Sequence, residues 1–365
     1  MKVTIKFLMF SLLLLIMTSC RVYTITDNRE FVDVTNTYGS DKTIYTHNNE
    51  DSKCSSKNHD IDKSEQTCPG YITIQDRQFC ILETEVALRT SDLTSEDLEP
   101  LRYMTNLTSL SLGAGSLIAV MDYVLNASDE QYSYSYGSAS DLIPLDITPL
   151  AGLTSLTHLE LTGVLIFDIS PLADLTNLTT LNLEINGISD ITPLAGLTNL
   201  TRLDIGVNPI DDLSPLSNLN SLEILTLCGF LTDTTFDLEP LRSLTNLSYL
   251  RIRSRQLECR DITPLAGLVS LQSLDLSHNQ ISDLAPLRYL TNLEELSVGD
   301  NQIRDLAPLA GLTNIDFIGA GNNQISDLTV LTNLCSNSFL WLQGNPITDW
   351  SPVEHIGQVI GRPNP

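Results

Sequence analysis

The chain repeats itself with a unit of 22 residues between Leu98 and Asp349. The clearest copy reads ITPLAGLTNLTRLDIGVNPIDD at 191–212, and the preceding copy, at 169–190, reads ISPLADLTNLTTLNLEINGISD. Ten copies can be counted. A unit this short cannot bury its own apolar face, whereas stacked copies bury one continuous core. The repeat therefore predicts an elongated stack of coils with capped ends.

Apolar residues occupy the tenth, thirteenth and fifteenth places of each unit, as in Leu200, Leu203 and Ile205. Apolar and polar residues alternate around the last two of these places, which is the pattern of a strand with one buried face. Each unit therefore predicts one short strand, and stacked units predict a parallel sheet.

Two polar places recur with the same period. The eighteenth place holds asparagines that we expect to lie inside the turn and bond backbone groups; they are Asn186, Asn208, Asn279, Asn301, Asn323 and Asn345. An aspartate such as Asp190 or Asp283 precedes the next unit and suits a cap on a short helical turn. Proline fills the third place in nine of the ten units. This regular recurrence indicates structural roles.

The pattern L-x-x-L-x-L-x-x-N resembles the 22-residue, internalin-like class of bacterial leucine-rich repeat proteins over residues 98–349. The resemblance implies a leucine-rich repeat solenoid of the α/β class, mostly parallel β with short 3-10 turns. It would be a curved, right-handed arc of about ten coils, with the sheet on the concave face. The resemblance also implies that the chain binds a protein partner.

The N-terminus, MKVTIKFLMFSLLLLIMTSC, places Lys2 and Lys6 before an apolar run and small or polar residues before Cys20. This is the pattern of an export signal over residues 1–19. Its end resembles a bacterial lipobox, which implies that Cys20 is acylated and anchors the chain to a membrane of the cell envelope. An ordinary cleaved secretory signal is the alternative. Both interpretations place the protein outside the cytoplasm.

The remaining segments follow from composition. We predict a polar, flexible tether over 20–67, an N-terminal cap over 68–97, repeats over 98–349 with an insertion at 116–145, and a C-terminal cap over 350–365.

Six cysteines follow Cys20 in a chain predicted to be exported, where disulfides are expected. Cys68 and Cys80 flank a predicted short hairpin and form the first expected pair. Cys228 and Cys259 lie in adjacent repeats with lengthened loops, which predicts a second bridge.

The chain has a net charge of −25, which argues against a nucleic-acid partner. Its five histidines are scattered, and we find no nucleophile elbow, phosphate loop or metal-spaced Cys/His set, so we predict neither an enzyme nor a cofactor. One group of outward strand residues is expected to converge: His158, Glu160, Glu184 and Asp204. We interpret it as a solvated acidic part of the partner-binding face, with a bound cation as the alternative.

The segment RIRSRQLECR at 251–260 concentrates arginines in an acidic chain. The repeat frame sends Tyr249, Arg251 and Arg253 onto the concave sheet. Two interpretations remain open. The arginines pair with Asp275 and Glu295 along the same face, or they contact an acidic feature of a ligand.

Phe317, Phe339 and Trp341 fall at outward strand places in the last two repeats. Exposed aromatics on one face favour an interface. The sequence therefore predicts a lipid-anchored envelope protein that binds a protein partner through its concave face. An envelope-structural or assembly lipoprotein, or a glycan-binding module, is the alternative.

Overall fold

The computed structural model describes residues 23–25, 31–33, 68–90, 93–114, 144–229, 237–253 and 259–363. The chain divides into two compact units, Met1–Gly70 and Tyr71–Pro365. In the first unit, β1 (Tyr23–Ile25) pairs with β2 (Phe31–Asp33) in an antiparallel manner. The predicted signal sequence and Cys20 lie outside the described residues, as do most of the predicted tether and nearly all of the predicted insertion.

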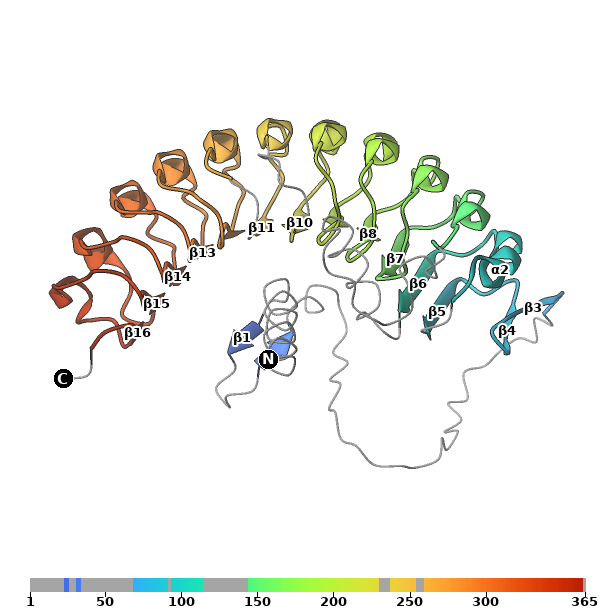
Figure 1. Ribbon diagram of the computed structural model, residues 1–365, viewed down its shortest axis with the longest axis horizontal. Helices are drawn as coiled ribbons and strands as arrows, with labels where there is room; N and C mark the ends of the chain where they lie inside the picture. The colour runs from blue at the N-terminus through green and yellow to red at the C-terminus, as the bar shows by residue number, and fades with distance from the viewer. Residues whose placement is uncertain are drawn as a thin grey trace, which may run out of the picture. The chain divides into compact units, whose positions relative to one another are not determined.

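The second unit contains a parallel sheet of 12 described strands whose order follows the chain. These strands are β5 (Glu85–Thr90), β6 (Ser109–Ala114), β7 (His158–Thr162), β8 (Thr180–Asn182), β9 (Arg202–Asp204), β10 (Ile224–Cys228), β11 (Tyr249–Arg253), β12 (Ser273–Asp275), β13 (Glu295–Ser297), β14 (Phe317–Gly319), β15 (Phe339–Trp341) and β16 (Gln358–Ile360). The strands line the concave side of this unit (Figure 1). The leucine-rich repeat solenoid predicted from the repeat is confirmed.

Short 3-10 turns form the convex side (Figure 1). They are η2 (Glu99–Tyr103), η4 (Thr148–Leu150), η5 (Ser170–Leu172), η6 (Thr192–Gly196), η7 (Ser214–Asn218), η8 (Glu239–Leu241), η9 (Thr263–Gly267), η10 (Ala285–Tyr289), η11 (Ala307–Gly311), η12 (Thr329–Asn333) and η13 (Ser351–Val353). The predicted aspartate cap is present: Asp190 Oδ1 accepts the N–H of Thr192 at 2.8 Å, and Asp283 Oδ1 accepts that of Ala285 at 2.7 Å. These aspartates are therefore structural.

The core is a continuous apolar column between the sheet and the 3-10 turns. Leu200, Leu203 and Ile205, the three inward places of one unit, are fully buried. The equivalent side chains of neighbouring coils join them in one cluster that extends from Ile72 to Ile356. Burying one such side chain contributes roughly 1.5–3 kcal/mol, so stacking supplies the stability that a single coil lacks.

The buried asparagines connect neighbouring coils. Asn208 Nδ2 donates to the carbonyl oxygens of Leu183, Ile205 and Gly206 at 2.9, 3.1 and 3.1 Å, and its Oδ1 accepts the N–H of Ile188 at 3.1 Å. Asn186, Asn301, Asn323 and Asn345 repeat these contacts. One side chain therefore satisfies backbone groups that the turn would otherwise bury without partners.

The N-terminal end of the solenoid begins with an antiparallel hairpin of β3 (Tyr71–Ile74) and β4 (Arg77–Cys80). Strand β5 then adds to the parallel sheet, and α2 (Ser95–Leu98) follows it. Thr94 and Asp97 form a capping box at the start of this helix. The first coil of the sheet therefore departs from the repeat sequence while keeping its strand.

At the C-terminal end, the chain completes most of an eleventh coil. Turn η13 buries Val353, and Trp350 packs against the core. Strand β16 then pairs with β15, so the sheet extends one strand beyond the last full repeat.

We predict that Asn208→Ala lowers the free energy of unfolding by about 3 kcal/mol, because it leaves several buried backbone groups without partners. Urea unfolding followed by circular dichroism measures this change. The control is Asn199→Ala, which removes one exposed contact, to Thr176 O, and should cost less than about 1 kcal/mol. Equal losses in the two variants would contradict the proposed role of the buried asparagine.

Candidate binding surface on the concave face

Strand register arranges the outward side chains of the concave face in rows, one residue per coil, with neighbours about 4.8 Å apart. Row one contains His158, Thr180, Arg202, Ile224, Tyr249, Ser273, Glu295, Phe317, Phe339 and Gln358. Row two contains Glu160, Asn182, Asp204, Thr226, Arg251, Asp275, Ser297, Gly319, Trp341 and Ile360. The face thus has three parts, namely a polar start, an ionic middle and an aromatic end.

The predicted acidic group at the start of the face does not converge. His158 lies in row one, Glu160 and Asp204 lie in row two on either side of Asn182, and Glu184 follows the end of β8. Glu160 and Asp204 are therefore about 9–10 Å apart along the sheet. Within the described residues, no cluster of three His, Cys, Asp or Glu side chains could hold a metal ion. The cation alternative has no support in this geometry.

The middle of the face is an ion cluster. Arg253 Nε and Nη2 each lie 2.6 Å from Asp275 Oδ2, and Arg251 Nε lies 3.5 Å from the same oxygen. The Arg251 side chain is only 4% exposed, and its guanidinium lies 5.7 Å from the centre of the Tyr249 ring. Glu295 instead accepts the hydroxyl of Ser273 at 3.1 Å. The arginines thus pair within the face through Asp275, as the first interpretation predicted, and not through Glu295.

Burial and charge shift the pKa values of Asp275 and of the nearby Asp204 in opposite directions. Burial by itself would raise the pKa of Asp275, but Arg253 and Arg251 outweigh it and hold the pKa below its usual range. Burial dominates at Asp204 and raises its pKa, despite a hydrogen bond from Gly206 and nearby arginines. Asp275 is therefore the carboxylate that compensates the arginines.

The C-terminal part of the face is aromatic. Phe317 and Phe339 stack in row one with ring centroids 5.6 Å apart and planes inclined by 12°. Trp341 lies in row two and is 49% exposed, and Ile360 beside it is 41% exposed. We call these four residues the aromatic patch. Ile360 was not predicted, because the repeats were expected to end before β16, although the alternation in GQVIG signals that strand.

The cysteines differ from prediction at one pair. Cys68 and Cys80 are both disulfide-bonded. Cys228 and Cys259 are not, so the predicted second bridge is wrong. Cys228 follows Leu227 on β10 and pairs in register with outward-facing Arg253, whereas Cys259 belongs to the hydrophobic core. Cys228 is therefore directed away from the core cluster that contains Cys259, and burial raises the pKa of Cys259 to about 11.

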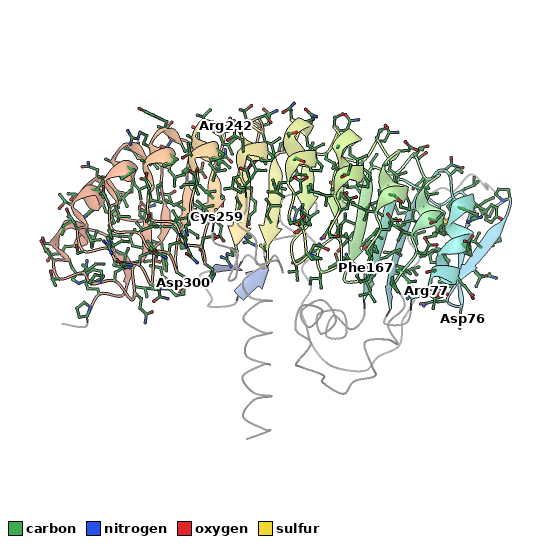
Figure 2. All side chains as sticks on the ribbon, turned by 45° about the horizontal axis from the view of Figure 1, so that its top comes forward. Asp76, Arg77, Phe167, Arg242, Cys259 and Asp300 are labelled. Carbon is green, nitrogen blue, oxygen red and sulfur yellow. The ribbon has the colours of Figure 1, made fainter. Side chains whose placement is uncertain are left out.

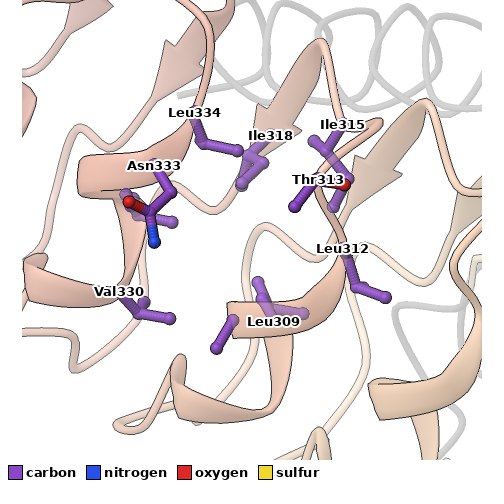
Figure 3. A pocket seen from close by; sticks show the side chains of 10 residues that line it. Leu309, Leu312, Thr313, Ile315, Ile318, Val330, Asn333 and Leu334 are labelled. Atoms are coloured by element: carbon purple, nitrogen blue, oxygen red, sulfur yellow. The ribbon is translucent and has the colours of Figure 1, made fainter.

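A small slot between η11 and η12 is lined mainly by apolar side chains, including Leu309, Ile318 and Val330 (Figure 3). Its lining contains no titratable group, so it offers no chemistry for catalysis. Among the described residues, no helix has the length and apolar character needed to cross a membrane.

Comparison with known proteins identifies the class. The family model described as "Leucine Rich repeats (2 copies)" matches residues 176–218, 269–311 and 291–333. The structure of an internalin, inlF, from Listeria monocytogenes is 30% identical, with a TM-score of 0.57, over 76% of this chain and 86% of that chain. The chain therefore belongs to the internalin-like family of bacterial leucine-rich repeat proteins.

Two further solved structures share the repeat. An internalin C2 from the same species is 33% identical over 58% of this chain and 80% of that chain, with a TM-score of 0.38. A plant peptide hormone receptor, RGFR1, in complex with RGF2, is 17% identical over 76% of this chain and 42% of that chain, with a TM-score of 0.53. No curated protein matches the chain. The fold suggests a role in protein binding.

We predict that Arg251→Ala lowers the free energy of unfolding by about 3 kcal/mol, because it leaves buried carboxylates less compensated. The control is Arg242→Ala on the convex side (Figure 2), where the Arg242 to Glu239 ion pair is about half exposed. Its loss should leave the unfolding curve nearly unchanged, because exposed ion pairs add little stability. Urea unfolding compares the two variants, and a stable Arg251→Ala protein would show that the ion cluster is not structural.

Proposed function

We propose that this chain is a non-enzymatic, lipid-anchored protein of the bacterial cell envelope, and that it binds a protein partner through the aromatic patch on its concave face. The observation that carries the proposal is the exposure of large apolar side chains at one end of a face whose middle is closed by ion pairs. Large exposed apolar groups are costly in water unless a partner covers them.

The geometry of the patch supports protein contact. Two stacked rings and an adjacent Trp341 present a rigid surface, because each side chain extends from a strand that is paired on both sides. Aromatic side chains on rigid elements lose little conformational entropy on binding and are enriched among residues that dominate binding energy. Membership in the internalin-like family supports the same role.

We predict that Trp341→Ala weakens partner binding by about 2 kcal/mol while leaving the unfolding curve nearly unchanged. The partner is identified by cross-linking the tagged full-length chain in cells, followed by mass spectrometry, and its affinity is then measured by calorimetry. The control is Tyr289→Ala, because Tyr289 is a 68% exposed aromatic on the convex turn η10. A partner that binds both variants as tightly as the parent would place its binding site outside the patch.

The anchor has its own test. We predict that Cys20→Ala shifts the protein from the membrane fraction to the soluble fraction or blocks its maturation, because one side chain would carry the acyl groups. Detergent phase partitioning and electrophoretic mobility report the result. A variant that partitions and migrates like the parent would support the ordinary secretory signal instead.

A further inference from the structure

On the described strands from β7 onward, the outward arginines of the concave face all precede β12. Arginines at outward places occur on β9 and β11, whereas the outward places of β12 to β16 hold no Lys, Arg or His. The only charged residues there are Asp275, which Arg253 and Arg251 compensate, and Glu295. Glu295 is exposed and its carboxylate accepts one hydroxyl, from Ser273. Glu295 is therefore the charged residue that remains exposed beside the aromatic rings.

Glu295 directly adjoins the aromatic patch. It is in register with Phe317 on the next strand, and Phe317 is in register with Phe339. Strand spacing places Glu295 about 4.8 Å from Phe317 along row one and about 10 Å from Phe339. The side chains of one extended peptide are spaced closely enough to contact the carboxylate and both rings at the same time.

Two glycines let the aromatic rings lie directly against the strand backbone. A Cβ atom added at Gly319 would lie 3.1 Å from the Phe317 ring, and one added at Gly321 would lie 3.1 Å from the Trp341 ring. The rings therefore lie against bare backbone, and a side chain at either glycine would displace them. A π-face beside a carboxylate attracts a cation through both the ring quadrupole and the charge.

We infer that the aromatic patch together with Glu295 binds a basic segment of the partner, in which a lysine or arginine lies over the rings and pairs with Glu295. This inference rests on the proposed function and specifies the chemistry of its partner. The surrounding charge also favours a positively charged partner, because residues 261–363 contain eleven Asp and Glu but only three Arg and no Lys. Such a field speeds encounter with a cationic partner and disfavours an acidic one.

The inference is tested with three labelled decapeptides that alternate serine with lysine, glutamine or glutamate, titrated against the full-length chain by fluorescence anisotropy. The lysine peptide should bind about tenfold more tightly than the glutamine peptide, and the glutamate peptide should bind least. The preference should shrink in about 0.5 M salt, because exposed charges are screened there.

Matched variants locate the effect. Glu295→Gln should reduce the affinity for the lysine peptide about threefold, and Trp341→Ala should reduce it further. The matched charge control is Glu354→Gln, because Glu354 is exposed on the turn at the C-terminal end and lies outside the rows of the concave face. It should leave the affinity unchanged. Thermal melting checks that each variant is folded.

Equal affinities for the three peptides, no binding by any of them, or an unaltered affinity after Glu295→Gln would overturn the inference. The proposed function survives those outcomes if Trp341→Ala still weakens capture of the natural partner. If Trp341→Ala leaves natural-partner binding intact, the proposed function fails instead, whatever the peptides do.

Discussion

The hydrogen bonds of the buried asparagines make a stack of coils possible. A chain that turns after every short strand leaves backbone groups inside each turn, where water cannot reach them. Asn208 meets this need with one side chain that donates to the carbonyl of Leu183 and accepts the N–H of Ile188, both in the preceding coil. Because each asparagine contacts the coil before its own, the order of one coil depends on its neighbour. This coupling keeps the strands in register and turns the outward side chains into continuous rows.

The middle and the C-terminal end of the concave face differ in what their side chains contact. In the middle, Arg251 and Arg253 belong to the solenoid itself, because Asp275 on the next strand meets them. At the C-terminal end, Phe317 and Phe339 stack on each other while Trp341 remains half exposed. A surface already closed by ion pairs gains little from a ligand, whereas an exposed ring gains from being covered. The candidate site therefore lies where the internal pairing stops.

Cys228 and Cys259 are not bridged, although the sequence predicted a disulfide between them. Cys228 and Cys259 have similar places in lengthened repeats, and sequence spacing alone favoured a bridge between them. In a strand, however, successive side chains point to opposite faces, so Cys228, next to the inward Leu227 on β10, points away from the core cluster although it is buried. Cys228 is in register with outward-facing Arg253, whereas Cys259 lies after the strand among core side chains. The lengthened loops hid this difference from any count of residues.

The sequence by itself determined the period, the inward leucines, the buried asparagines and the aspartate caps, because each is a local requirement that recurs in every coil. It also placed Tyr249, Arg251 and Arg253 on the concave face, since alternation along a strand needs only the frame of the repeat. Tertiary structure alone decided what those side chains do. The choice between ion pair and ligand contact depended on whether Asp275, a full coil away, lies within bonding distance. The extent of the aromatic patch depended on the last strand, β16, which brings Ile360 beside Trp341. Such contacts arise between coils, where packing and register set the distances, and no single repeat contains that information.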